Sequence, residues 1–528
     1  MSLLHRPRSR GAAFGLAAAV LLTGFRAHAQ SPTRLLRTPS VSSRHIAFAY
    51  ANNVWIVERA GGSARRLTSF QGQTQNPKLS PDGRLVAFSA EYAGNTDVYV
   101  VPVEGGQPTR LTWHPGADVV QGWTPDGKQV MFAEGWRNQR NNFYVKNLHG
   151  TDWAAVKTMY EPLLAHVNHR ADLNYLIDNM GAETAIGHSY VRGGDLPDVP
   201  NASGGLLGAD FTIEGDRYRI ARVYDAESWN PELRAPLVTP GVNVSRGDYL
   251  LAINGVELRA PDNVYRLLDG TANRQTVLTV NSRPDLQGAR LVTVVPVANE
   301  QGLRTRAWVE SNRRYVDSVS KGTLAYVYLP NTGVPGYTSV NRYYFAQQDR
   351  LGVVVDERFN GGGSAADYIV DLLGRDFDGY FNNPVGDRFP YTSPANGIWG
   401  PKVMIINEMA GSGGDLMPYM FKRRKLGPLV GARTWGGLVA TTDTPPFVDG
   451  GSMIAPRFGF FSRENAFAVE NEGVAPDIDV ENFPREVNAG RDPQLERATQ
   501  EALRLLSTWK NPRANTEPTP PVWGKRGR

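Results

Sequence analysis

Asn-Glu-Met-Ala-Gly-Ser-Gly-Gly-Asp, residues 407–415, is a turn of small residues between two patterns of different period. The apolar run at residues 403–406 predicts a buried strand, and the spacing of apolar residues predicts a helix over residues 416–425. Ser412 is then expected where a strand ends and a helix begins, among free backbone N–H groups. That setting suits a nucleophile whose attack creates an oxyanion. A helix N-cap would use a serine in the same place, so this stretch alone leaves both roles open.

A second glycine turn follows another expected strand, over residues 352–356. Residues 360–363 read Asn-Gly-Gly-Gly, and a helix is expected over residues 365–373. A turn of this kind exposes N–H groups to an anion. It is not a phosphate-binding loop, because no Gly-Lys-Ser/Thr follows, and its glycines are not spaced as in a dinucleotide fingerprint. This turn and the N–H of Gly413 are the expected oxyanion donors.

A serine nucleophile needs a base, and histidine is the usual one. The chain has eight histidines, and none follows His188. The base for Ser412 must therefore come from an upstream domain, which places the site at a domain interface. His188 is the best candidate because it follows a helical segment and Gly187 leaves room for close approach. A structural role for this histidine is the alternative.

Other polar residues complete the set of candidates. Glu470 is the candidate carboxylate that orients the imidazole, and the alternative is a surface glutamate. His166 and His169 stand three apart on an expected helix, but no acidic residues nearby complete a zinc site. We therefore expect neither a metal nor another cofactor.

Length and composition set limits on the fold. With 528 residues the chain is long enough for three or four domains, each with its own core. Contents of 41% hydrophobic and 21% charged residues exclude low-complexity disorder for most of the chain. The chain has no cysteine, which excludes disulfides, a cysteine nucleophile and thiolate metal sites.

Residues 1–29 have the pattern of an export signal. Three arginines precede an apolar stretch over residues 12–25, and Ala-His-Ala at residues 27–29 matches a cleavage site. The stretch is short for a membrane span, and an uncleaved anchor is the alternative. We expect a periplasmic or extracellular mature protein with no integral membrane segment. Four arginines leave with the signal, so the formal charge falls from +5 to about +1, which points to no nucleic-acid partner.

Repeats with a spacing of about 40 residues occupy residues 43–133. Similar apolar triplets end at Phe48, Phe88 and Phe132, and Arg-Leu-Thr closes the first two units. This spacing predicts four-stranded propeller blades. About two and a half blades are present, so an incomplete β-propeller is expected.

The rest of the chain divides by its periodicity. Apolar residues at helical spacing predict a small helical domain over residues 134–203, which carries His188. Strands alternate with helices over residues 301–510, which predicts an α/β serine peptidase domain. Residues 511–528 are rich in proline with a basic end, and a disordered tail is expected there.

Residues 204–300 look like a peptide-binding PDZ module. The carboxylate-binding loop and the strand after it would contain Leu207, Gly208 and Phe211. Such a module binds an extended peptide as an added strand through backbone N–H groups. A purely structural β-domain is the alternative.

These features together resemble the tricorn protease family, serine peptidases related to the C-terminal processing peptidases. The resemblance covers nearly everything from Gly135 to Leu506 and includes the PDZ module. Its motifs, in order, are Arg-Gly-Gly-Asp at 192–195, Asn-Gly-Gly-Gly at 360–363, Ala-Gly-Ser-Gly-Gly-Asp at 410–415, Arg-Thr-Trp-Gly-Gly at 433–437 and Val-Glu-Asn at 469–471. The implied fold is multidomain α+β: partial β-propeller blades, a small helical domain, a PDZ-like domain and a ClpP/crotonase-like α/β peptidase domain.

The resemblance also implies roles for single residues. Ser412 would be the nucleophile, His188 the base, and Glu470 part of the charge-orienting network. Gly413 and Gly362, or the glycine before it, would supply the oxyanion N–H groups. Peptides or unfolded proteins would be the substrates. Family members form rings, so a homo-oligomer is compatible with the resemblance.

The sequence departs from the family pattern in three places. Gly187 stands where family members carry a serine before the catalytic histidine, so Glu470 must reach His188 in another way. No lysine takes the place used by Ser–Lys relatives, which favours a histidine base. Blade-like sequence also runs directly into the helical domain, so the substrate gating by full propellers is expected to be absent or altered.

The leading hypothesis is an exported serine peptidase that works through an acyl-enzyme. In this hypothesis Ser412 attacks a peptide carbonyl and His188 shuttles the proton. The alternative is a catalytically silent protein that binds peptides through its PDZ module and blades. The two hypotheses differ in whether a reactive serine is present.

Overall fold

The computed structural model describes residues 36–112, 116–123, 127–197, 199, 203–225, 227, 230–386, 390–512 and 518–524. The expected export signal lies outside these residues, and so do residues 513–517 and 525–528 of the expected tail. The chain divides into two compact units, residues 1–126 and 127–528.

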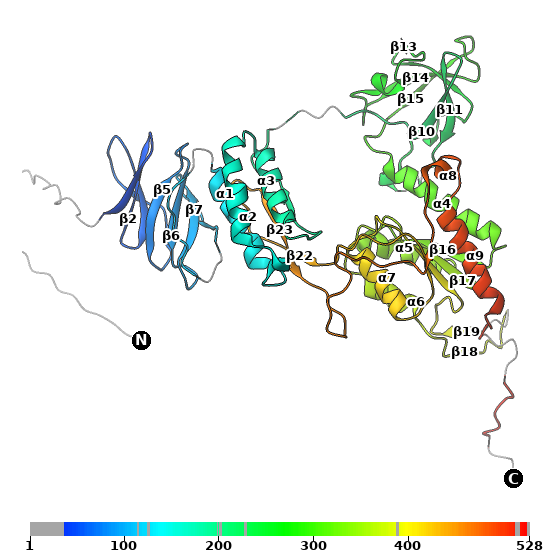
Figure 1. Cartoon of the computed structure of the whole chain (residues 1–528). Coiled ribbons are helices and arrows are strands. Elements are labelled where there is room, and N and C mark those ends of the chain that lie inside the picture. The colour runs from blue at the N-terminus through cyan, green and yellow to red at the C-terminus, as the bar shows by residue number, and fades with distance from the viewer. Residues whose placement is uncertain are drawn as a thin grey trace, which may run out of the picture. The chain divides into compact units, whose positions relative to one another are not determined.

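The first unit contains two four-stranded antiparallel sheets, each with its strands in sequence order. The strands are β1 Arg37–Val41, β2 His45–Tyr50, β3 Asn53–Glu58 and β4 Arg65–Arg66, then β5 Thr74–Leu79, β6 Leu85–Ala90, β7 Asp97–Pro102 and β8 Thr109–Arg110. The repeated Arg-Leu-Thr motif closes each sheet in the same way. Thr68 Oγ1 accepts the N–H of Val54 at 3.0 Å, and Thr112 Oγ1 accepts the N–H of Val98 at 2.9 Å. These two sheets are the predicted propeller blades (Figure 1).

The prediction that a third blade begins at residues 130–132 is wrong. The triplet ending at Phe132 lies in α1, Lys128–Asn142, so the blade-like region to residue 133 holds two blades among the described residues. Met131, Phe132, Gly135 and Gln139 are buried at helical spacing on one face of α1. An apolar triplet is too short to distinguish a strand from a buried helical face, and the longer pattern decides.

Helices α1, α2 (Trp153–Tyr160) and α3 (Arg170–Ala182) form the helical region of the second unit. Short 3₁₀ turns at Leu148–Gly150 and Glu161–His166 connect them. The core of this region includes Phe447 and Met453 from far along the chain. Helical and peptidase regions therefore share one core.

A small antiparallel sheet joins the same two regions. Its order is β22 (Ala440–Asp443), β23 (Ser452–Phe458) and β9 (Tyr190–Arg192). Tyr190 pairs with Ile454, and the Arg170 guanidinium forms an ion pair with Asp449 at 2.5 Å. Since β9 begins two residues after His188, this pairing fixes the histidine's segment to the peptidase domain.

The PDZ region is an antiparallel sheet in the order β10-β11-β12-β14-β15, with β13 paired to β12. The strands are β10 Ala209–Glu214, β11 Arg217–Val223, β12 Tyr249–Ile253, β13 Val256–Glu257, β14 Thr276–Asn281 and β15 Arg290–Val294. Short 3₁₀ turns lie at Pro231–Leu233, Pro236–Val238 and Val264–Leu268. Strand β10 lies at the edge of this sheet, so one side of its backbone is open to an added strand.

The peptidase domain contains a parallel sheet in the order β16-β17-β20-β21-β24. Its strands are β16 Leu324–Tyr328, β17 Gly352–Asp356, β20 Lys402–Ile406, β21 Leu429–Gly431 and β24 Ile478–Asp479. Its helices are α4 Gln301–Val319, α5 Val334–Phe345, α6 Ala366–Leu373, α7 Gly413–Arg423, α8 Pro484–Asn488 and α9 Pro493–Thr508, and a hairpin of β18 Gly379–Phe381 and β19 Tyr391–Ser393 lies outside the sheet.

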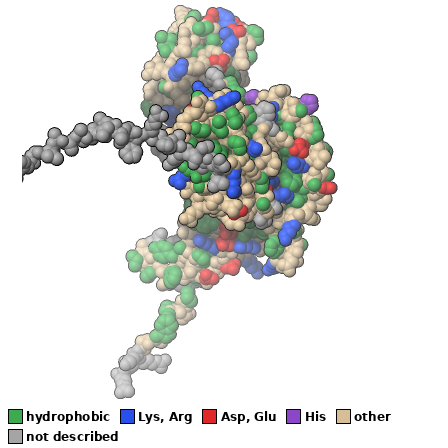
Figure 2. Space-filling model, turned by 90° about the vertical axis from the view of Figure 1, so that its left-hand side faces the viewer, with side chains coloured by type: hydrophobic (Ala, Val, Ile, Leu, Met, Phe, Trp, Pro, Cys, Tyr) green, Lys and Arg blue, Asp and Glu red, His purple; other side chains and the backbone are tan. Residues whose placement is uncertain are grey.

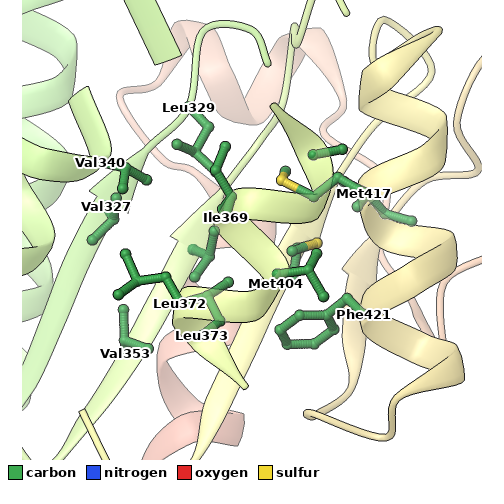
Figure 3. Close-up of a cluster of buried hydrophobic side chains, with 14 of the residues drawn as sticks. Val327, Leu329, Val340, Val353, Ile369, Leu372, Leu373, Met404, Met417 and Phe421 are labelled. Atoms are coloured by element: carbon green, nitrogen blue, oxygen red, sulfur yellow. The ribbon is translucent and has the colours of Figure 1, made fainter. Parts of the chain in front are cut away.

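Helices cover both faces of this sheet. Side chains of α5, α6 and α7 pack on one face, where Val327, Ile369, Met404 and Phe421 meet (Figure 3). Side chains of α4 and α9 pack on the other face. Every residue of β16, β17 and β20 is buried, as the continuous apolar runs of these strands predict for a sheet buried on both sides.

The surface carries charges of both signs. Lys and Arg side chains are interspersed with Asp and Glu side chains on the face shown in Figure 2. Across the described residues we found no helix with the length and apolar character needed to cross a membrane.

Candidate active site

Ser412 lies in a strained turn between β20 and α7. Its φ of 59° and ψ of −114° are unusual for a residue with a side chain. Its N–H donates to Asp415 Oδ2 at 2.7 Å, and its carbonyl accepts the first helical hydrogen bond, from Leu416 at 3.0 Å. The turn therefore presents the hydroxyl at the end of a strand and the start of a helix, as predicted.

Asp415 connects the turn that contains Ser412 to the loop at residues 434–437. Besides Ser412, its carboxylate accepts the hydroxyl of Thr434 at 2.5 Å, the N–H of Gly436 at 2.8 Å and that of Gly437 at 3.2 Å. It is fully buried, and this burial raises its pKa above the ordinary aspartate value in spite of the four donors.

The glycine turn after β17 lies against the turn that contains Ser412. Gly411 donates its N–H to the carbonyl of Asn360 at 3.0 Å. A Cβ built on Gly362 would lie 2.7 Å from the Cβ of Ser412 and 3.1 Å from its Oγ, so only glycine fits there. The two parallel strand–turn–helix units thus meet at Ser412.

The N–H groups of the two turns are not all free. Gly362 donates to Asn360 Oδ1 at 3.0 Å, and Gly361 donates to the carbonyl of Pro330 at 3.1 Å. Within the described part of the chain, no acceptor is present for the N–H of Gly413 or Gly363. Gly413 and Gly362 were predicted as oxyanion donors, and Gly363 was not. Residue type alone does not indicate which of three consecutive glycines has a free N–H.

A buried acid lies beneath the glycine turn. Glu357 is 0% exposed, its Oε2 accepts the Nδ2 group of Asn360 at 3.2 Å, and its Oε1 has no partner among the described residues. Burial raises the pKa of Glu357 well above its usual range, and the nearby charge of Asp415 adds to this effect. Glu357 was not predicted as a site residue, because it directly follows a buried strand and nothing in the local sequence indicates a functional role.

His188 is half-buried in front of β9, and its ring lies between aromatic neighbours. The ring centroid is 5.3 Å from that of Trp435, at 70°, and 6.1 Å from that of Tyr190, at 89°. Its Nδ1 atom is buried and has no hydrogen-bond partner in the described chain. Burial lowers the pKa of His188 below its ordinary value, although the charges of Glu470 and Asp415 oppose this shift. A neutral imidazole is what a general base requires.

Trp435 lies between His188 and the turn that contains Ser412. Its backbone N–H donates to the carbonyl of Ala410 at 2.9 Å, and its ring lies against Gly411. His188 and Ser412 therefore lie in one neighbourhood, although the described residues include no hydrogen bond between them. Sequence reasoning noted this tryptophan only as part of a motif, because no local pattern indicates which distant residue it contacts.

Glu470 contacts the histidine's segment through the backbone. Its Oε2 accepts the N–H groups of Leu438 and Val439, both at 2.7 Å, and its Oε1 lies 3.4 Å from the nitrogen of Gly187. The next residue, Asn471, donates its Nδ2 group to the carbonyl of Ala185 at 2.8 Å. Glu470 is thus held beside the site rather than free on the surface.

The PDZ groove differs from the expectation at its loop. A cavity of about 450 Å³ is lined by Phe211 of β10 and by residues around Val264. Leu207 lies in the core of the PDZ region, 3% exposed. The N–H of Gly208, expected to hold a peptide carboxylate, donates instead to Glu300 Oε2 at 2.9 Å. A carboxylate of the same chain therefore occupies the loop.

The two helical histidines do not form a pair of ligands. The ring of His169 caps α3, because its Nδ1 atom accepts the N–H of Ala171 at 3.1 Å. A search of the described residues found no group of three or more metal-ligating side chains that could hold an ion.

Comparison with known proteins assigns three parts of the chain. Residues 33–198 match the Tricorn protease N-terminal beta propeller domain, and residues 205–299 match the Tricorn protease PDZ domain. Residues 323–480, which hold Ser412 and both turns, match Peptidase family S41. The fold and the site therefore define an S41-type peptidase domain with attached PDZ and blade domains.

Two relatives and one solved structure support a closer assignment. The Tricorn protease of Thermoplasma volcanium is 33% identical over 377 residues, 71% of this chain and 36% of that protein. Tricorn protease homolog 1 of Streptomyces coelicolor is 37% identical over 389 residues, 73% of this chain and 36% of that protein. A crystal structure of the tricorn protease matches with a TM-score of 0.68 and 26% identity, over 90% of this chain and 47% of that one. The chain belongs to the tricorn protease family, and it spans little more than a third of these curated relatives.

Proposed function

We propose that this protein is an exported serine peptidase that hydrolyses peptides or unfolded proteins. The observation that carries the proposal is the position of Ser412, in a positive-φ turn where two strand–turn–helix units meet. The unengaged N–H of Gly413 beside it suits an oxyanion, and the low pKa of the nearby His188 suits a base.

In the proposed reaction the Ser412 Oγ attacks the carbonyl carbon of the peptide bond while the His188 imidazole accepts the hydroxyl proton. The N–H groups of Gly413 and of the turn containing Gly362 stabilise the oxyanion. The intermediate collapses when the imidazolium gives its proton to the leaving amine, which leaves an acyl ester on Ser412. Water then attacks the ester while the imidazole takes a proton from it, and the imidazolium returns that proton to Ser412 Oγ as the ester bond breaks and the carboxylic acid is released.

Glu470 supports this cycle from a distance. Its negative charge stabilises the imidazolium that forms in each step, as the direction of its effect on the pKa of His188 indicates. Its contact with Gly187 also holds the segment before the histidine. Substrate binding would complete the approach of the imidazole to Oγ, since catalytic hydrogen bonds often tighten only in the complex.

The decisive experiment is active-site labelling of the mature protein with a fluorophosphonate probe, together with cleavage of a peptide library. Labelling and cleavage are expected for the wild type and are expected to be lost in Ser412→Ala. Ser364→Ala, directly after the Asn-Gly-Gly-Gly turn, is the matched control and should keep both labelling and cleavage. Cleavage by Ser412→Ala at the wild-type rate would overturn the proposal.

A second candidate function is a catalytically silent peptide-binding protein. It is favoured by the lack of a described hydrogen bond between His188 and Ser412. Peptide binding at the cavity lined by Phe211, without probe labelling of the wild type, would support this candidate. Whether the protein is monomeric or a homo-oligomer is measured in the same preparations by light scattering.

A further inference from the structure

The indole of Trp435 fills a slot between the two halves of the site. Three glycines, Gly187, Gly411 and Gly437, border this slot. We call it the indole slot. A Cβ on Gly187 would lie 2.9 Å from two carbons of the six-membered ring, and a Cβ on Gly411 would lie 2.5 Å from a third. A Cβ on Gly437 would also overlap the ring. Side chains larger than hydrogen at these positions would displace the indole.

The two ends of the slot belong to the two candidate reacting groups. Gly187 directly precedes His188, and Gly411 directly precedes Ser412. The indole therefore acts as a spacer between the backbone at the base and the backbone at the nucleophile. Its own backbone is held at the nucleophile side by the hydrogen bond to Ala410 at 2.9 Å.

The imidazole lacks the usual means of orientation. A histidine base is normally held by a hydrogen bond to Nδ1, but the Nδ1 atom of His188 is buried without a partner among the described residues. What the ring does have is two edge-to-face contacts, with Trp435 and with Tyr190. Edge-to-face aromatic pairs have a defined geometry and a favourable energy of about 0.5–1.5 kcal/mol.

We propose that Trp435 is a positioning residue: its indole sets the orientation of the His188 imidazole toward Ser412. This inference rests on the proposed function, because it assigns a role within that reaction. The three glycines of the indole slot contact the ring closely and limit its movement, while the residue as a whole is 46% exposed. Aromatic packing here takes over the orienting task of a hydrogen-bonded partner.

The kinetic test compares Trp435→Phe and Trp435→Ala in the full mature chain. We expect the alanine variant to lose about tenfold to a hundredfold in kcat, with KM little changed, because the base is misplaced rather than the substrate. The phenylalanine variant keeps an aromatic ring but lacks the outer carbons that contact Gly187 and Gly437, so its kcat should lie between those of the wild type and the alanine variant. Trp509→Ala, which removes a partly buried indole beside Gly400 at the other end of β20, should behave as the wild type.

The pH profile gives a readout that a merely structural role would not move. The groups that face the imidazole are Trp435, Tyr190, Glu470 and Asp415. Removing the indole admits water, so burial lowers the pKa of His188 less and the acid limb of kcat/KM should move to higher pH. A wild-type kcat for Trp435→Ala, or a raised KM at unchanged kcat, would overturn the inference.

A spectroscopic measurement separates this inference from the proposed function. In ¹⁵N-histidine-labelled protein, the ring signals of His188, assigned by their loss in His188→Gln, should shift in Trp435→Ala and stay near the wild-type position in Trp509→Ala. This result is expected even if no peptide is cleaved. Unchanged His188 signals in Trp435→Ala would refute the positioning role, and an inactive wild type with shifted signals would refute only the proposed peptidase activity.

Discussion

Glu470 meets the backbone of Gly187 rather than the imidazole of His188. Its Oε1 atom lies 3.4 Å from the Gly187 nitrogen, while its Oε2 atom is fully engaged by two N–H groups of the neighbouring loop. The carboxylate therefore acts on the imidazole in two ways: through the electric field of its charge, and through its contact with the backbone segment that carries His188. Substitution of Glu470 tests the effect of its charge on His188.

Neutralising Glu470 should move the acid limb of the pH profile. Burial lowers the pKa of His188, and the charge of Glu470 opposes that shift, so Glu470→Gln should lower the pKa further. The acid limb of kcat/KM then moves to lower pH and kcat falls, which is measured on a fluorogenic peptide. Glu472→Gln, two residues away, is the control. An acid limb that stays in place would show that the carboxylate does not act on this histidine.

Gly413 and Gly361 should respond differently to alanine. A Cβ on Gly413 would overlap the hydroxyl of Thr332 and the backbone of Gly363, whereas one on Gly361 meets nothing within 4 Å. Alanine keeps the backbone N–H, but this overlap would move the N–H away from the oxyanion, so we expect Gly413→Ala to slow fluorophosphonate labelling about a hundredfold or more. Gly361→Ala should label at the wild-type rate. Equal rates for the two variants would contradict the placement of the oxyanion.

Asp415→Asn should destabilise the fold. The carboxylate accepts four donors, and an amide would turn its own N–H₂ group toward some of them. We expect a loss of about 1–3 kcal/mol in the free energy of unfolding, measured by urea denaturation. The exposed Asp371, paired with Arg424, gives the control, and Asp371→Asn should change stability by about 0.5 kcal/mol or less. Equal losses of unfolding free energy for the two variants would show that the buried hydrogen bonds of Asp415 contribute no more to stability than an exposed ion pair.

Glu357 should make stability depend on pH. Its folded pKa is raised well above its ordinary value of 4.5, so the folded state holds a proton that the unfolded state has lost. The contribution of Glu357 is complete below pH 4.5 and is lost as pH rises through the folded pKa, at about 1.4 kcal/mol per pH unit between the two values. Glu357→Gln cannot ionise, so its stability relative to the wild type should increase as pH rises in that window. Parallel stability curves for the two proteins would argue that Glu357 ionises normally.

Removing Glu300 should open the PDZ loop. Glu300 occupies the N–H of Gly208, and Arg304 pairs with both Glu300 and Asp210. We expect Glu300→Ala to bind peptides with a free C-terminal carboxylate about tenfold more tightly, an effect equal to one charge-assisted hydrogen bond, measured by fluorescence anisotropy. Peptides with an amidated C-terminus are the control and should gain nothing. An equal gain for both peptides would place the binding elsewhere.

Local patterns were sufficient for the turns and insufficient for the contacts between distant segments. Ser412 was located because a buried strand, small residues and a helix follow one another within the reach of one pattern. The triplet at Phe132 was misassigned because a strand and one side of a buried helix look alike over three residues. The N–H of Gly208 was expected to be free, and the pattern of the loop does not show that Glu300, from 92 positions further on, reaches it. Likewise nothing near Trp435 in sequence indicates that it touches His188.

Strand β9 reaches the peptidase domain as the third member of a small sheet, and a shared core and the ion pair between Arg170 and Asp449 reinforce that attachment. The segments that carry His188 and Ser412 are therefore held together by tertiary contacts as well as by the chain between them. A break in the connecting segment after Leu196 would leave two fragments with complementary faces, and we expect these fragments to reassemble into one folded unit.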